Sequence, residues 1–257
     1  MFYKGLIQLS FLLAVSNINA SIIEDKLGRY QVFLENGTYG NTPLPTQPKT
    51  RYYTFLKAFK HFQKYQGRTV LELGTSRSYV HGGLPGCNSN DIKYWNPDRP
   101  EGWDWGAGFF TRMAAECLIP LGATIYTVDL ASDHIARCKV MTSEFKANIR
   151  YIKGSSIDIL KSWDVNHKID LIYLDTGDMT PIEPTAELQL EEAKIIVVRN
   201  LLAKNGILLI DDVKNPTPQL YGDTSGLGKS KYALPYLLSH GFEIVENEYQ
   251  VILKRIH

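Results

Sequence analysis

Three aspartates stand where their carboxylates could do chemistry together. Asp175 follows an apolar run at residues 169–174, and Asp211 and Asp212 follow another at residues 207–210. If both runs are neighbouring parallel strands, the three side chains meet at one edge of a sheet. Like charges repel in a partly buried site, and a hard divalent ion such as Mg²⁺ would relieve that repulsion through oxygen ligands. The alternative is that Asp211 and Asp212 cap turns while Asp175 binds water.

A second set of candidate residues surrounds Gly74. Residues 70–74 read Val-Leu-Glu-Leu-Gly, an apolar strand that ends in an acidic residue and a glycine. Buried parallel strands end in this way where the backbone approaches a nucleotide-like ligand. Gly74 has no Cβ to block that approach, and Glu72 can accept hydrogen bonds from a ribose or an amino group. Dinucleotide-binding oxidoreductases begin in the same way, so the later segments decide between the two classes.

Strands and helices alternate along the chain. We expect strands at residues 70–73, 123–128, 149–152, 169–174 and 207–210, and helices at about 50–66, 109–118, 132–145 and 185–203, the last of them stopped by Asn205-Gly206. A helix near 228–240 then leads into two strands, 242–245 and 251–253, whose short connection permits only an antiparallel pair. The sequence thus predicts an α/β fold with a mostly parallel seven-stranded sheet, helices on both faces and an antiparallel C-terminal hairpin.

The amino terminus differs from the rest of the chain. Lys4 precedes an apolar run at residues 5–16, and Ala20 offers a small residue before a cut. This pattern is typical of a signal peptide over residues 1–20 and is too short for a membrane span. A cleaved leader implies an exported protein, periplasmic or secreted. An uncleaved one implies a cytoplasmic or membrane-associated protein, whose membrane contact runs only through this segment.

Residues 21–66 are predicted to form an N-terminal arm and a helix, followed by one large domain at 67–257. Prolines within residues 43–48 make helix unfavourable, and we interpret the arm before residue 50 as extended. The domain carries an insertion at about 79–105 that is rich in glycine, proline and tryptophan. Loops this long are usually functional, and the tryptophans either cover a ligand as a lid or pack the loop against the body.

Composition limits the classes of partner. The chain has 257 residues, 44% of them hydrophobic, which is enough for one large core. Its net charge of +1 gives no electrostatic support for binding nucleic acid. Cys117 and Cys138 fall at apolar positions of predicted helices, which favours core thiols over a disulfide.

Five strand-end motifs, taken together in this order, make residues 70–255 similar to class I S-adenosylmethionine-dependent methyltransferases. The motifs are residues 70–74, 127–129, 154–158, 170–175 and 206–212. The last two resemble the metal-binding strand ends of catechol-type enzymes, in the small-molecule O-methyltransferase branch. The resemblance implies a Rossmann-like fold, S-adenosyl-L-methionine as cofactor and a small hydroxylated acceptor such as a sugar or phenolic metabolite. Nucleic acid is not an expected partner, and a homodimer remains open.

The resemblance also implies a role for individual residues. Asp129 would grip both ribose hydroxyls, and Ser156 would hydrogen-bond near the adenine. The residues expected at the cofactor are Glu72, Gly74, Ser76, Gly106, Gly108, Asp129 and Ser156. Ser76 departs from the second glycine that is usual in this family. The alternatives are that Asp129 caps a helix and that Ser156 is a turn residue.

The expected catalytic residues are Asp175 and Asp178. Mg²⁺ held by Asp175, Asp211 and Asp212 would lower the pKa of the acceptor hydroxyl and orient it. Catechol-type enzymes carry a lysine base shortly after the aspartate of the fourth strand, where this chain has Asp178. Either Asp178 or His81 from the insertion could replace that base.

Two other functions stay open at this point. An NAD(P)-dependent oxidoreductase fits the strand–glycine start and Asp129, although the chain has a terminal hairpin and lacks an uninterrupted G-x-G-x-x-G. An exported binding protein that no longer methylates fits the serines after Gly74 and the leader.

Overall fold

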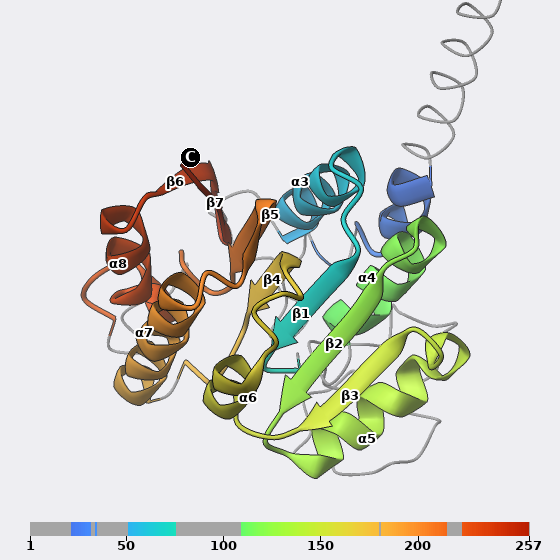
Figure 1. Ribbon diagram of the computed structural model, residues 1–257, viewed down its shortest axis with the longest axis horizontal. Coiled ribbons are helices and arrows are strands. Elements are labelled where there is room, and N and C mark those ends of the chain that lie inside the picture. Colours follow the sequence, from blue (N-terminus) through green and yellow to red (C-terminus); the bar gives the residue numbers. More distant parts are fainter. Residues whose placement is uncertain are drawn as a thin grey trace, which may run out of the picture.

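The core of the molecule is a seven-stranded sheet in the order β3-β2-β1-β4-β5-β7-β6 (Figure 1). The computed structural model describes residues 22–31, 34, 51–75, 109–179, 181–214 and 223–256. The strands are β1 (Thr69–Leu73), β2 (Thr124–Asp129), β3 (Ile149–Lys153), β4 (Ile169–Leu174), β5 (Leu202–Ile210), β6 (Phe242–Asn247) and β7 (Val251–Arg255).

Strands β1 to β5 pair in parallel, whereas β7 runs antiparallel to both β5 and β6. This confirms the predicted α/β fold with its mostly parallel sheet and antiparallel C-terminal hairpin. From β1 the chain builds outward through β2 to β3, and it then returns to place β4 and β5 on the other side of β1. The boundary between β1 and β4 is therefore the switch point where open α/β sheets bind their ligands.

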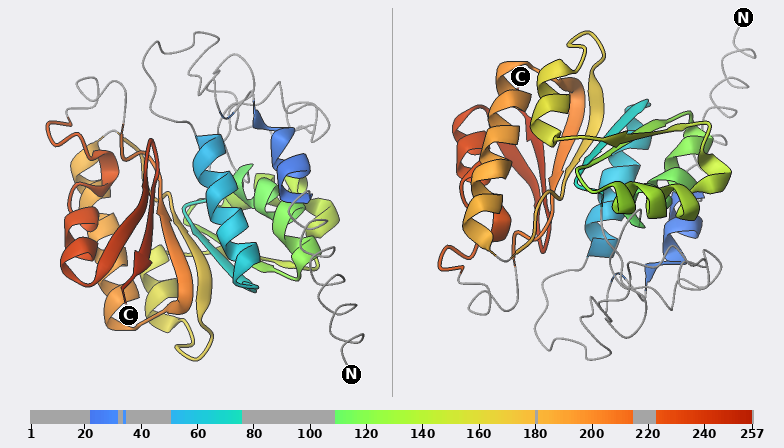
Figure 2. Two further views of the ribbon diagram at one scale, coloured as in Figure 1. Left: turned by 90° about the horizontal axis from the view of Figure 1, so that it is seen from above. Right: turned by 90° about the horizontal axis from the view of Figure 1, so that it is seen from below.

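Helices cover both faces of the sheet (Figure 2). They are α3 (Arg51–Lys64), α4 (Phe109–Leu118) and α5 (Ser132–Met141) on one face, and α6 (Ser156–Ser162), α7 (Ile182–Val198) and α8 (Ala233–Ser239) on the other. Short 3-10 turns are η3 (Ile119–Leu121), η4 (Ser143–Phe145) and η6 (Gly228–Ser230). Each helical layer buries an apolar stripe against the strands, which explains why the β1 side chains are buried on both faces.

The layer on the α3 side contains a cluster of aromatic rings. Phe110 stacks on Tyr173 with ring centroids 4.2 Å apart, and Phe55 meets both rings at 5.6 Å. These contacts join α3 and α4 to β4, the strand that carries Asp175. Aromatic packing of this kind holds α3 against β4 on this face of the sheet.

The arm is not extended throughout. Residues 22–28 are helical, and Ile23, Leu27 and Tyr30 are fully buried in the α3-side core. Their spacing of four and three residues is typical of one face of a helix. The prolines at 43–48 lie after this segment and do not prevent it from being helical. The prediction of an extended arm is therefore wrong for residues 22–28.

Two further boundaries differ from the prediction. The helix expected at 185–203 ends at Val198, and Asn200 adopts the left-handed conformation (φ 50°) that terminates helices. Strand β5 begins earlier, at Leu202, so Gly206 lies inside the strand and does not stop the helix. A Cβ at Gly206 would lie 2.8 Å from the carbonyl oxygen of Ile169, which shows that close strand pairing is why glycine is needed there. Helix α6 was not predicted, because its seven residues are too few for a clear periodic pattern.

Several predicted features lie outside the described residues. They are the leader at 1–20, the insertion at about 79–105 with its tryptophans, and the site candidates Ser76, His81, Gly106 and Gly108. Within the described ranges, no helix has both the length and the apolar character needed to cross a membrane.

Gly74 gives a test of this architecture. Its φ is +82°, and a Cβ would lie 2.4 Å from the carbonyl oxygen of Asp175. Gly74→Ala should lower the free energy of unfolding by at least about 2 kcal/mol, because the backbone of β4 cannot yield. Gly154→Ala is the control, since its Cβ would meet only the Ile159 side chain at 3.7 Å. Urea denaturation should show a change within roughly 1 kcal/mol for the control. Equal losses in both variants would refute the close approach of β1 and β4.

Candidate active site

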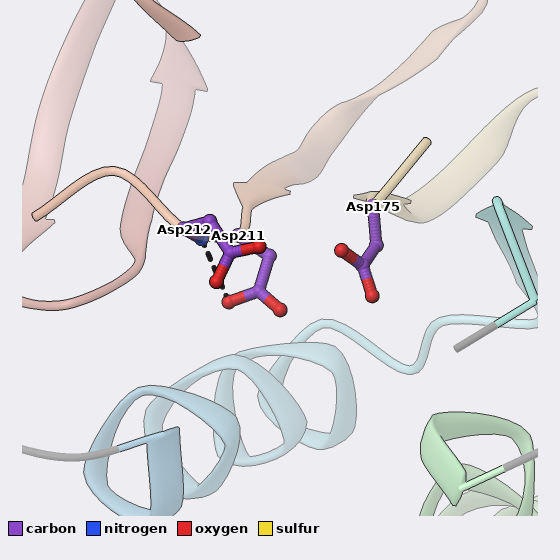
Figure 3. A group of neighbouring side chains, drawn as sticks. All are labelled: Asp175, Asp211 and Asp212. Carbon is purple, nitrogen blue, oxygen red and sulfur yellow. Dashed lines mark hydrogen bonds between the residues drawn. The ribbon is translucent and has the colours of Figure 1, made fainter. Parts of the chain in front are cut away.

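The three aspartates predicted from the sequence do converge at the ends of β4 and β5 (Figure 3). Asp175 follows β4, while Asp211 and Asp212 follow β5, and one carboxylate oxygen from each lies within 4.8 Å of the others. Asp211 is buried, and the other two are only slightly exposed. This aspartate cluster (Asp175, Asp211 and Asp212) lies directly beside the switch point, because Asp175 follows β4, one of the two strands at that boundary.

Arg51, the first residue of α3, binds two of the three aspartates. Its Nε donates to the two carboxylate oxygens of Asp211 at 2.9 and 3.1 Å, and its Nη2 donates to Oδ2 at 3.0 Å. The same Nη2 lies 2.7 Å from Oδ1 of Asp212. The guanidinium also stacks over the ring of Tyr249, with Cζ 4.2 Å from the centroid. A planar fork held in this way can neutralise a buried carboxylate.

Lys229, in η6, joins the two strands. Its Nζ donates to Oδ1 of Asp175 at 2.7 Å and lies 3.0 Å from Oδ2 of Asp212. The residue is 1% exposed. Burial alone would lower the pKa of Lys229, but Asp175 and Asp212 hold it above its usual range, so the ammonium stays charged.

Neutral donors complete the cluster. Tyr173 Oη donates to Oδ2 of Asp211 at 2.8 Å, and Gln250 Nε2 donates to Oδ1 at 3.1 Å. The hydroxyl of Tyr249 donates to Oδ1 of Asp212, and that of Tyr173 lies 3.5 Å from Oδ2 of Asp175. Five of the six carboxylate oxygens therefore already face a donor, whereas Oδ2 of Asp175 has only this long contact, because Tyr173 donates its single proton to Asp211.

These contacts do not fit a divalent metal ion as the side chains are arranged. An ion bound by all three carboxylates would have to displace donors from them and would lie beside the Lys229 ammonium. The two side-chain cations already offset most of the charge that made a metal attractive at the sequence level. Mg²⁺ at Asp175, Asp211 and Asp212 remains a prediction.

The cluster separates the acidities of its members. Burial raises the pKa of Asp175 to about 7; Lys229 acts against this shift, and Asp211 and Asp212 add to it. Burial also acts to raise the pKa of Asp212, but Lys229 and Arg51 hold it below its usual range. Two carboxylates with such different environments can take different roles in proton transfer.

Asp178, the other predicted catalytic residue, is not part of this cluster. It is exposed, and its carbonyl oxygen accepts a hydrogen bond from Thr185 Oγ1 at 2.8 Å. Its role as a base is untested. Lys229 and Arg51 were not identified from the sequence, because Lys229 is 54 residues from Asp175 and Arg51 is 160 residues from Asp211, with no pattern that links them.

Asp129 and Gly74 stand at the ends of β2 and β1, where a cofactor would lie. Asp129 Oδ1 accepts a hydrogen bond from the backbone of Ala131 at 2.7 Å, and its Oδ2 lies 3.2 Å from His134 Nδ1. One oxygen therefore shapes the turn before α5, but Asp129 is not the cap of that helix, because the N-cap residue is Ala131. The carboxylate remains partly exposed, which fits an acceptor of ribose hydroxyls.

Glu72 and Ser156 point into the protein. Glu72 is fully buried, and its Oε2 accepts hydrogen bonds from Thr111 and, at 2.7 Å, from Thr127. This placement favours a role in joining β1, β2 and α4 over contact with the cofactor. Ser156 begins α6 and is 7% exposed, and Glu192 of α7 accepts a hydrogen bond from Thr176 Oγ1 at 2.8 Å. Burial raises the pKa of Glu192 to about 7, although Ser156 and Thr176 act to lower it.

Comparison with known proteins agrees with this geometry. Residues 105–213, less than half of the chain, match a family described as a methyltransferase domain. No curated protein matches the sequence. The structure of methyltransferase PaMTH1 from Podospora anserina, bound to SAH, is similar at 15% identity and a TM-score of 0.54, covering 91% of this chain and 97% of the other.

Two further solved structures are similar. Cofactor-bound Rv0187 from MTB has 12% identity and a TM-score of 0.50, covering 89% of this chain and 88% of its own. An rRNA methylase from Streptococcus thermophilus has 13% identity and a TM-score of 0.43, covering 79% and 96%, which is too low to inform the choice of acceptor. The chain therefore has the Rossmann-like fold of these methyltransferases, as the strand-end motifs implied, and residues 105–213 match a methyltransferase domain.

Arg51 provides a test of the site. Arg51→Ala should lower the free energy of unfolding by roughly 3–5 kcal/mol, because it leaves the buried Asp211 carboxylate without its cation. Lys57→Ala, in the same helix, removes an ion pair with Glu246 in which the lysine side chain is 45% exposed. Thermal or urea unfolding should show a change of only about 0–1 kcal/mol for that control. Equal effects would mean that the Arg51 pairs are no stronger than surface pairs.

Proposed function

We propose that this chain of methyltransferase fold transfers a methyl group from S-adenosylmethionine to an oxygen of a small hydroxylated acceptor. The observation that carries the proposal is the aspartate cluster at the ends of β4 and β5, beside the switch point at β1. It supplies a carboxylate of raised pKa next to the edge where a ligand would lie. Proton removal from a hydroxyl is the chemistry that such a group performs best near neutral pH.

Two residues are suited to hold the cofactor. Gly74 allows the end of β1 to approach β4 closely, and Asp129 at the end of β2 offers its carboxylate to the two ribose hydroxyls. When bound, S-adenosylmethionine supplies a methyl group on a positively charged sulfur, which departs as a neutral thioether. The task left to the protein is to position and deprotonate the acceptor.

Asp175 is the group that we assign to proton removal. Its Oδ1 is held by Lys229 at 2.7 Å, while its Oδ2 has only the long contact to Tyr173 and can turn to an acceptor hydroxyl. Asp175 takes the hydroxyl proton as the acceptor oxygen forms its bond to the methyl group. The nearby Lys229 ammonium stabilises the negative charge that develops on that oxygen.

Other features of the chain support a small acceptor over nucleic acid. The net charge of +1 gives no overall electrostatic attraction to a polynucleotide. The antiparallel β6–β7 hairpin and the match to a methyltransferase domain do not support the alternative function, that of an NAD(P)-dependent oxidoreductase. Export with cleavage near Ser21 also remains a proposal, which the amino-terminal sequence of protein from its native host would test.

The cofactor assignment predicts the effect of Asp129→Ala. Loss of hydrogen bonds to a charged acceptor, about 1.5–3 kcal/mol each, should weaken S-adenosylmethionine binding by at least about tenfold in calorimetry. Asp133→Ala is the matched control, because that aspartate lies on the exposed side of the first turn of α5 and contacts Arg137 at 3.4 Å. Unchanged affinity in folded Asp129→Ala would remove Asp129 from the cofactor site.

The base assignment predicts a pH dependence. Asp175 must be ionised to accept a proton, so kcat/KM should fall as pH drops below about 7 and level off above it. Release of S-adenosylhomocysteine would be followed over a panel of phenols and sugars. Asp175→Asn should lose most of the turnover, and its residual rate should not show the change in kcat/KM near pH 7. Asp178→Asn should keep both the rate and the pH dependence. If Asp178→Asn loses them and Asp175→Asn keeps them, Asp178 is the base.

A further inference from the structure

We propose that Lys229 stands in the place of a divalent metal ion in the aspartate cluster and is the positioning residue for the Asp175 carboxylate. The inference deepens the proposed function and rests on the same site. It predicts that the cluster is closed to metals in the native protein. Removing the ammonium should open it.

The first reason is geometric. The ammonium bridges one carboxylate from β4 and one from β5, at 2.7 Å from Asp175 and 3.0 Å from Asp212. A metal ion joining these strand ends would bridge the same two residues. Arg51 binds the third carboxylate, that of Asp211, through both of its oxygens. A metal ion among the three would lie against a fixed positive charge in a buried site, where repulsion is strong.

The second reason is that the fold holds Lys229 in place. Gly228 has φ +54°, and a Cβ there would lie 1.8 Å from the carbonyl oxygen of Asp212, so η6 packs directly on the end of β5. The backbone amide of Gly228 donates to Oδ2 of Asp223 at 2.9 Å. Lys229 Nζ lies also 3.4 Å from the carbonyl oxygen of Gly177. A lysine anchored from several sides is part of the site and is not a surface side chain that happens to reach it.

The third reason concerns the reaction. A bound metal would take the acceptor oxygen as a ligand, whereas an ammonium can only donate hydrogen bonds and attract charge. By holding Oδ1 of Asp175, Lys229 leaves Oδ2 as the oxygen that faces a proton donor. The site therefore needs no metal to be loaded before it can act.

The experiment titrates the full-length protein with Mn²⁺ and measures the free ion by electron paramagnetic resonance. Wild-type protein should bind no Mn²⁺ at the cluster up to about 1 mM. Lys229→Met keeps the apolar stem but leaves the carboxylates without their shared cation, and it should bind Mn²⁺ at least about tenfold more tightly than wild type. Lys231→Met is the matched control, because Lys231 pairs with Glu183 outside the cluster and should not change Mn²⁺ binding.

Two further variants assign the signal to this site. Asp175→Asn combined with Lys229→Met should lose the gained Mn²⁺ binding, because one carboxylate ligand is neutralised. Lys229→Arg retains a cation and should bind no more Mn²⁺ than wild type, while keeping more turnover than Lys229→Met. Circular dichroism checks that each variant folds. If Lys229→Met does not fold, the wild-type titration still tests whether the cluster is closed to Mn²⁺.

Two results would overturn the inference. One is Mn²⁺ binding by wild-type protein that Asp175→Asn abolishes, and the other is a folded Lys229→Met that gains no binding. Calorimetry with S-adenosylmethionine on the same preparations separates this inference from the proposed function. Failure to bind the cofactor rejects the function and leaves the metal result standing. Mn²⁺ binding with normal cofactor affinity rejects only the role of Lys229.

Discussion

Two buried cations and three carboxylates hold the working edge of this sheet together. Arg51 ties the start of α3 to the end of β5, and Lys229 ties η6 to the ends of β4 and β5. Without these ion pairs, the negative charges of three buried aspartates would repel one another and push the ends of β4 and β5 apart. Arg51 at the start of α3, Lys229 in η6, and Tyr249 and Gln250 directly before β7 all contribute donors to the cluster.

The same interaction gives the site its chemistry. Asp212 lies between two cations and stays ionised, whereas Asp175 receives one cation and two like charges. Burial is the main cause that raises the pKa of Asp175 to about 7, the range in which proton transfer is efficient. Stability and reactivity thus depend on the same contacts. Changes at Arg51 or Lys229 are expected to affect both.

Much of this arrangement could be predicted from sequence, for a physical reason. Buried parallel strands are short apolar runs, so β1 and β4 and the aspartate that follows β4 are visible directly, and parallel strands bring their carboxyl ends to one edge. The cations could not be predicted, because Arg51 opens an amphipathic helix and Lys229 lies in a glycine-rich turn, where basic residues are usually solvated. Their burial is a result of tertiary packing. For the same reason the hydrogen bonds by which Glu72 joins β1 to β2 and α4 could not be predicted; its contact with the cofactor stays a prediction.

The most direct test is anomalous diffraction at the manganese edge, from crystals grown with S-adenosylhomocysteine and Mn²⁺. The account predicts the cofactor product along the ends of β1 and β2, beside Gly74 and Asp129. It also predicts the Lys229 ammonium between Asp175 and Asp212, with no anomalous peak among the aspartates. A manganese peak there, with Lys229 turned away, would contradict the account, as would a cofactor product bound elsewhere on the molecule.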